Sequence, residues 1–211
     1  TGNVQGQSST NNAAFTNIAG QTSATLLGTT IGSLTATRYY RAQVTIGTCS
    51  TVTTATITVT VNPISVAGTV SANQSICTGT SPANISLTGN TGTIQWQSST
   101  DNITFNAISG ATSSPLTGAT IGVLTSTRYY RDIVTNSPCV DATSSVVTVT
   151  VSPTSVAGTV SANQFICSGT SPANIVLSGN TGTIQWQSST NNIAFNTIAG
   201  ATSNTLLGTT I

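Results

Sequence analysis

Short runs of alternating apolar and polar residues, separated by turn residues, fill the central part of the chain. Val147, Val149 and Val151 alternate with threonines, as in a strand with one buried face. No run holds a helical period, although Ala119–Leu124 has room for one helical turn. The pattern predicts an all-β unit with strands at Gly68–Ser71, Ala83–Leu87, Thr93–Ser98, Phe105–Ile108, Leu116–Thr117, Thr127–Thr135 and Ser145–Val151.

The same pattern returns every ninety residues without a gap. The string TGNVQGQSSTNN at residues 1–12 returns as TGTIQWQSSTDN at 91–102 and as TGTIQWQSSTNN at 181–192. Between residues 63–121 and residues 153–211, 46 of 59 positions are identical. A fixed period of this length predicts a tandem array of whole domains, in which each unit contacts mainly its neighbours.

Valine-rich runs that end in proline mark the seams between the units. Proline has no amide donor and suits the end of a strand, so we place the boundaries at Pro63 and Pro153. This predicts a partial repeat over residues 1–63 that lacks its first third, a complete repeat over 64–153, and a partial repeat over 154–211 that lacks its last third. We expect the sequence to be part of a longer array. The alternative, in which strands of neighbouring chains complete the partial units, stays open.

About seven short strands in ninety residues are typical of an immunoglobulin-like β-sandwich. In Ile94-Gln95-Trp96-Gln97 the isoleucine and the tryptophan share a face, so we expect Trp96 and its repeat Trp186 in the cores. Gly6 occupies the equivalent place in the first unit. Either that unit repacks around the missing indole or the residue was assigned wrongly when the sequence was established.

The composition excludes most kinds of chemistry. The chain has no His, Lys, Glu or Met, and its only ionisable carboxylate side chains are Asp101, Asp132 and Asp141. General acid–base catalysis, zinc sites and clustered-carboxylate calcium sites therefore lack their usual residues. Four arginines are too few for a nucleic-acid interface, and no apolar run is long enough to enter a membrane. We expect a protein that is not an enzyme and needs no metal or cofactor.

The four cysteines also follow the ninety-residue period, two to a unit. Cys77 and Cys139 each stand beside turn residues, and we predict that they form a disulfide at one end of the complete unit. The equivalents Cys49 and Cys167 would then have partners outside this sequence. Two unpaired buried thiols are the alternative. Disulfides would indicate an oxidising compartment outside the cytoplasm.

The repeated TRYYR motif supplies the candidate binding residues. Tyr129 and Tyr130 must point to opposite faces of a strand, so one packs in the core and the other lies outside with Arg128 or Arg131. An exposed tyrosine beside arginines suits a surface that stacks against sugar rings. Ordinary surface packing is the simpler alternative.

The motifs ICTGT, QWQSS, the turn Phe105–Gly110 and TRYYR together resemble a known family. They are similar to the immunoglobulin-like, PKD-like repeats of giant secreted surface adhesins of gliding Bacteroidota. The resemblance covers all three units, and Gly6 departs from it. It implies export by the type IX secretion route, an extracellular location on the cell surface, and a filament that serves adhesion and gliding motility.

Repeats of that family usually act as the stalk that carries an adhesive tip. The expected function is therefore a spacer whose partners are the neighbouring repeats of the same chain. Two rivals remain. Each repeat could itself bind surface glycans, or the chain could be a subunit of a filament built by strand exchange.

Overall fold

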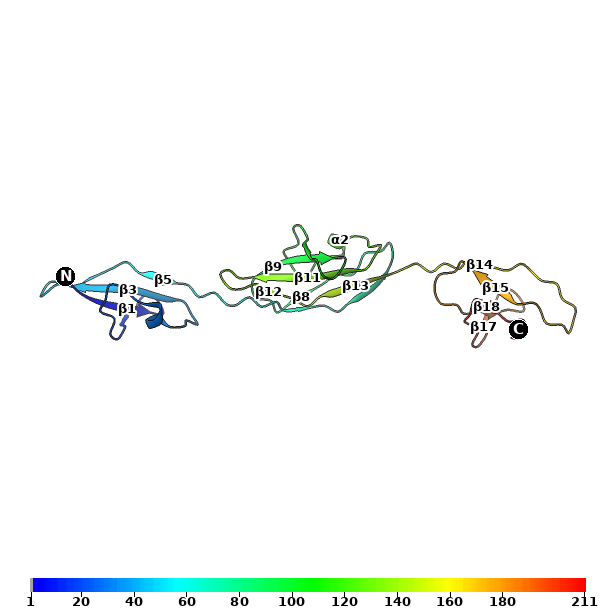
Figure 1. Ribbon diagram of the computed structural model, residues 1–211, viewed down its shortest axis with the longest axis horizontal. Helices are drawn as coiled ribbons and strands as arrows, with labels where there is room; N and C mark the ends of the chain where they lie inside the picture. The colour runs from blue at the N-terminus through cyan, green and yellow to red at the C-terminus, as the bar shows by residue number, and fades with distance from the viewer. Residues whose placement is uncertain (1) are drawn as a thin grey trace.

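The computed structural model describes residues 2–211 and shows three units that follow one another along a line (Figure 1). Strand pairing stays inside residues 3–59, 69–152 and 159–206, so no described sheet crosses a seam. The only helices of the described residues are single turns, α1 (Gly28–Ile31) and α2 (Gly118–Ile121). The all-β prediction is confirmed. Neither helix is long and apolar enough to cross a membrane.

The middle unit has the most strands of the three, and its main sheet has the order β10-β9-β11-β13-β7, with β12 paired to β11. A second pair joins β6 to β8, and an isolated bridge joins Ile85 to Leu116. The strands are β6 (Thr69–Val70), β7 (Gln74–Cys77), β8 (Leu87–Thr88), β9 (Thr93–Ser99), β10 (Asn106–Ala107), β11 (Arg128–Thr135), β12 (Ala142–Thr143) and β13 (Val147–Ser152).

The middle unit seals its own core. Trp96, Val134 and Val149 are fully buried, and the alternation of β13 places Val147 and Val149 on the inner face as expected. All members of this core come from residues 64–153: Ile85, Leu87, Trp96, Ala111, Leu116, Leu124, Tyr130, Val134, Val147 and Val149. Because no neighbouring unit contributes a buried side chain, the unit has what it needs to fold by itself.

The polar turn after β9 forms a hairpin to β10. Ser99 Oγ accepts hydrogen bonds from the amides of Asp101 and Asn102, and Asp101 Oδ1 accepts from Ile103 and Thr104. Asn102 adopts a left-handed conformation with a φ of 59°, which asparagine tolerates better than most residues. The backbone bonds and the Ser99 hydroxyl hold the pKa of Asp101 down at about 2.

Strand β7 was not among the predicted strands. Its residues, Gln74–Cys77, pair in parallel with β13, with Gln74 opposite Val149 and Cys77 opposite Ser152. The segment is a strand because its backbone pairs with the free edge of β13, the last strand of the unit. It also carries Cys77 to the end of the unit where Ser152 and Pro153 lead to the next one.

The two partial units contain the same pattern with fewer strands. The first has the order β2-β1-β3-β4, with β5 against β3, and the third has the short sheets β14-β15-β18 and β16-β17. Their strands are β1 (Asn3–Ser9), β2 (Thr16–Asn17), β3 (Arg38–Thr45), β4 (Val52–Thr53), β5 (Ile57–Val59), β14 (Thr159–Val160), β15 (Ile175–Ser178), β16 (Gln187–Ser188), β17 (Asn196–Thr197) and β18 (Thr205–Leu206).

Candidate functional site

The TRYYR motif lies at the start of β11 and splits between the two faces of the sheet. Tyr130 is 2% exposed and belongs to the core, where burial raises the pKa of its hydroxyl and the charge of Arg128 opposes that rise. Tyr130 is therefore the core tyrosine and Tyr129 the outer one, as alternation along the strand predicted, so Tyr130 drops out of the candidate glycan-facing residues. Tyr129 and Arg131 share the opposite, outer face because strand side chains alternate.

Arg131 is held on the outer face by two side chains of its own unit. Its Nε donates to Gln97 Oε1 at 2.8 Å, and Gln97 lies directly opposite it on β9. Its guanidinium carbon lies 4.0 Å from the centre of the Phe105 ring. One face of the guanidinium thus covers the ring that would otherwise be available for stacking.

The first unit repeats this arrangement. Arg41 Nε donates to Gln7 Oε1 at 2.9 Å, and the Arg41 guanidinium carbon lies 4.0 Å from the centre of the Phe15 ring. The arrangement is therefore a constant of the repeat wherever the arginine is present. We call the three residues the arginine clamp: Gln97, Phe105 and Arg131 in the middle unit, and Gln7, Phe15 and Arg41 in the first.

The clamp holds the hairpin of β9 and β10 against β11. We expect Phe105→Ala to reduce the free energy of unfolding of the middle unit by about 1 kcal/mol, since a partly exposed cation–π contact contributes about that much. Urea unfolding followed by far-UV circular dichroism measures the change. Ile103→Ala is the matched control, because Ile103 lies in the same hairpin and is 83% exposed. An equal loss in both variants would contradict a role for the clamp.

Trp96 lies on the buried face of the main sheet, the face opposite the arginine clamp. Its indole Nε1 donates to the carbonyl of Ser113 at 3.0 Å, and its side chain is fully buried. Trp186 Nε1 makes the equivalent bond to Ser203 at 2.8 Å, but its side chain is only half-buried. The core position predicted for Trp96 is what the structure shows. The sequence of the third unit contains no counterparts of β11 and β13, the strands that help to cover Trp96 in the middle unit.

Asp132 is a buried carboxylate that the sequence analysis did not single out as a core residue. It lies opposite Trp96 in the β9–β11 pair and is fully buried. Oδ1 accepts from the amide of Gln95 at 2.9 Å, whereas Oδ2 has no hydrogen-bond partner. Burial raises the pKa of this carboxyl to about 6, against the two backbone bonds that favour the charged form. The signal was present, because alternation along β11 places Asp132 on the same face as Tyr130.

The first unit repacks around Gly6. Gln21, which stands where the middle unit has Ala111, turns into the space of the missing indole and is 7% exposed. A Cβ on Gly6 would lie only 2.6 Å from Gln21 Cγ, so the glycine and the glutamine fit each other. Gln21 Nε2 donates to the carbonyl of Ser23, the counterpart of the Ser113 carbonyl bound by Trp96. Two matching changes support Gly6 as a true residue.

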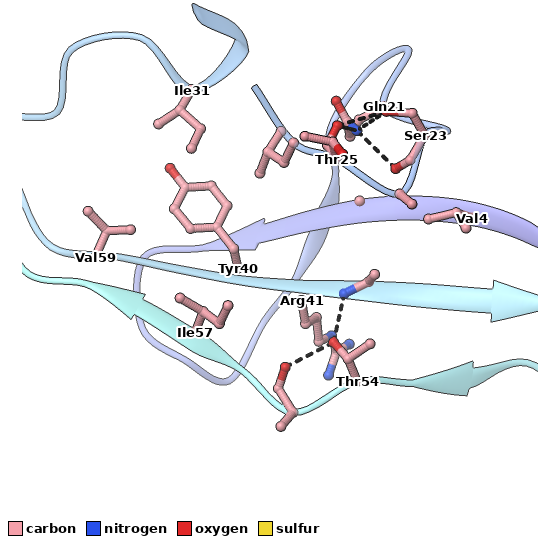
Figure 2. Close-up of a pocket in the computed structure, with 15 residues that line it drawn as sticks. Val4, Gln21, Ser23, Thr25, Ile31, Tyr40, Arg41, Thr54, Ile57 and Val59 are labelled. Carbon is pink, nitrogen blue, oxygen red and sulfur yellow. Dashed lines mark hydrogen bonds between the residues drawn. The ribbon is translucent and has the colours of Figure 1, made fainter. Parts of the chain in front are cut away.

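A cavity of about 450 Å³ remains beside Gln21 on the inner face of the first sheet. Figure 2 shows Ile31, Tyr40, Ile57 and Val59 pointing into this space from one side, while Gln21 closes the other. In the middle unit the equivalent residues pack against Ile85, Leu87 and Trp96. The repeat positions of Ile85 and Leu87 would precede Thr1, so the given sequence does not contain the residues that cover the corresponding space in the middle unit.

The predicted Cys77–Cys139 disulfide is not formed, and all four thiols are free. Cys77 ends β7 beside Ser152, at the end of the unit. Cys139 follows β11, which runs antiparallel to β13, and it lies beside Asn62 and Pro63 at the start of the unit. The predicted pairing is wrong because Gln74–Cys77 forms a strand beside β13, which places Cys77 at the opposite end of the unit from Cys139. Cys49 and Cys167 are exposed.

Within residues 2–211, no three His, Cys, Asp or Glu side chains lie close enough to share a metal ion. No curated protein matches the chain in sequence. A family model described as Domain of unknown function (DUF8696) matches residues 1–63, 66–153 and 156–211. The matches cover nearly the whole chain, one to each unit, and the chain therefore belongs to this family.

Proposed function

We propose that the chain is a spacer segment of an extended filament, in which each repeat adds length and none carries out chemistry. The observation that carries the proposal is the arrangement of the units in a line, each with its own sheets (Figure 1). A repeat that buries its core by itself keeps its shape when neighbours are added or removed. Length then grows in proportion to the number of repeats.

The seam between the first two units supports a stiff filament. Asn62 Nδ2 donates to the carbonyl of Ser137, and Asn136 Nδ2 donates to the carbonyl of Pro63 at 2.8 Å. The amide of Asn136 also donates to Ser65 Oγ at 3.0 Å. The linker is therefore fixed to the turn that follows β11 of the unit that it enters, and its proline further limits its backbone.

We extend the proposal to the fold and to the cellular role. Three features of the middle unit favour an immunoglobulin-like sandwich: the separate strand pair β6–β8, the last strand β13 and the core that the unit buries by itself. The motif resemblance then favours an extracellular adhesin stalk on a bacterial surface, with export by the type IX route. The very low charge, 3% of residues, suits a surface fibre whose shape must not depend on salt.

Small-angle X-ray scattering of the 211-residue chain tests the spacer function. We expect a maximum dimension that corresponds to three units in line, and a pair-distance distribution typical of a rod. Substituting Asn136→Ala removes the side-chain bond to the Pro63 carbonyl, while the backbone amide of residue 136 can still donate to Ser65 Oγ. We expect a broader distribution of end-to-end distances in single-molecule energy transfer. The control is Asn106→Ala in β10, far from the seam; an equally broad distribution there would contradict the stiffening role.

Glycan binding by each repeat is the second candidate function, and the outer face of Tyr129 and Arg131 is the observation in its favour. Two features of the clamp weaken it, since Gln97 occupies the Arg131 Nε and Phe105 is covered. A glycan array probed with residues 64–153 distinguishes the two functions. Strong binding that Tyr129→Ala abolishes would overturn the spacer function.

A further inference from the structure

The middle unit holds its two cysteines at opposite ends, and each end adjoins a seam. Cys77 ends β7 with its Cα opposite that of Ser152. The next amide along the chain, that of Thr78, donates to the carbonyl of Ser152 at 2.8 Å. Cys77 is exposed, whereas its neighbour Ile76 packs against the core, so the thiol points away from the interior. The seam after the middle unit therefore has a thiol of the preceding unit beside it.

The seam before the middle unit has a thiol of the following unit beside it. Cys139 Sγ lies 3.7 Å from the carbonyl oxygen of Asn62 and 3.4 Å from that of Pro63. Asn62-Pro63 and Ser152-Pro153 are the same position of the ninety-residue repeat. At the second seam the carbonyl of Ser152 accepts from the amide of Thr78, the residue after Cys77. At the first seam the equivalent carbonyl, that of Asn62, is contacted by the Cys139 sulfur.

The two seams lead into their units in the same way. Val66 bridges Thr91 in the middle unit, and Val156 bridges Thr181 in the third. Gly68 and Gly158 share a φ of 74°. If the backbone at Ser152-Pro153 repeats that at Asn62-Pro63, the Cys139-type sulfur and the Thr78 amide nitrogen lie 3.7 Å and 2.8 Å from the same carbonyl oxygen. A Cα–Cα distance of 4.4–6.8 Å, which a disulfide requires, is within reach of that arrangement.

We propose that Cys77 of one repeat forms a disulfide with the Cys139-type cysteine of the next repeat, so that the bond crosses the seam. Two thiols lose two protons and two electrons to a disulfide oxidant, which is itself reduced to two thiols. Within residues 2–211 each seam has only one member of the pair, Cys139 at the first and Cys77 at the second. The four free thiols agree with this.

Such a bond would brace consecutive units covalently at a point beside the linker proline. The pairing itself follows from the geometry alone. Its mechanical value rests on the proposed spacer function, because a braced seam resists bending and transmits tension that the linker hydrogen bonds would not bear. A filament of braced units would shorten or bend more easily once its disulfides were reduced.

The test extends the chain until one seam has both cysteines. Residues 122–153 are appended after Ile211, which is the repeat equivalent of Ile121, so that the third unit is completed in register. The purified chain is oxidised in a mixture of reduced and oxidised glutathione and digested without reduction, and its linked peptides are identified by mass spectrometry. We expect Cys77 linked to the appended copy of Cys139, at least tenfold more abundant than any other pair.

Three results would overturn the proposal: a bond between Cys167 and the appended copy, which is the pairing within one unit; no bond in a folded chain; or only intermolecular bonds. Cys77→Ser should abolish the link, and Cys139→Ser at the original position should leave it unchanged. If the extended chain does not fold, two copies of residues 64–153 joined in tandem present the same seam between two sealed cores. Because neither arm measures length or adhesion, failure here leaves the spacer function to its own scattering test.

Discussion

Trp96→Gly should destabilise the middle unit by about 4 kcal/mol, and Ala111→Gln should restore part of that loss. Removal of a buried tryptophan costs about 3–5 kcal/mol, because the apolar contacts vanish and a cavity remains. Ala111→Gln alone should also destabilise, since its side chain would collide with the indole. Together the two changes recreate Gly6 and Gln21, in which the glutamine fills the space and bonds to the Ser23 carbonyl.

The expected coupling energy between the two positions is about 1–3 kcal/mol, in the range measured for residues in direct contact. Guanidinium unfolding of residues 64–153, followed by far-UV circular dichroism, gives the four free energies of the double-mutant cycle. Trp96→Gly with Ala107→Gln is the matched control, because Ala107 is exposed on β10 and lies outside the core. Additive losses at positions 96 and 111 would show that Gln21 does not compensate for Gly6.

Strand positions with one buried face were predictable from the sequence. The alternating valines of β13 and the buried Trp96 followed from period-two patterning. These features depend on local sequence alone. The helical turn at Gly118–Ile121 also falls inside the stretch where one was expected.

Features that depend on distant pairing were not predictable in the same way. Gln74–Cys77 has little alternation and becomes a strand only because β13 lies beside it in parallel. That one pairing decides which end of the unit holds Cys77, and so it decides the disulfide question. Gln21 was overlooked although the repeats contain the signal: where tryptophan becomes Gly6, the alanine fifteen residues later becomes Gln21.

Asp132 should make the middle unit less stable as the pH rises from about 4 to 7. In the unfolded chain its carboxyl ionises near the ordinary value of 3.8, whereas burial raises its folded pKa to about 6. Between those values the folded state binds more protons than the unfolded state, so the free energy of unfolding falls with rising pH. A difference of about two pKa units corresponds to a loss of up to about 3 kcal/mol.

Asp132→Ala should remove this pH dependence because it removes the carboxyl. The fold should accept the alanine, since the first unit has Ala42 at the same position. The chain has no His and no Glu, so few other groups titrate between pH 4 and 7.

The control is Asp101→Asn, which copies Asn11 and Asn191 of the other units. The pKa of Asp101 is lowered to about 2, so the stability that this carboxylate gives is lost only as the pH falls below 4. Asp101→Asn should therefore leave the slope of the free energy of unfolding between pH 4 and 7 unchanged. Urea unfolding of residues 64–153 from pH 3 to 8 measures both arms. A decline between pH 4 and 7 that persists unchanged in Asp132→Ala would mean that another group carries it and that folding does not raise the pKa of Asp132.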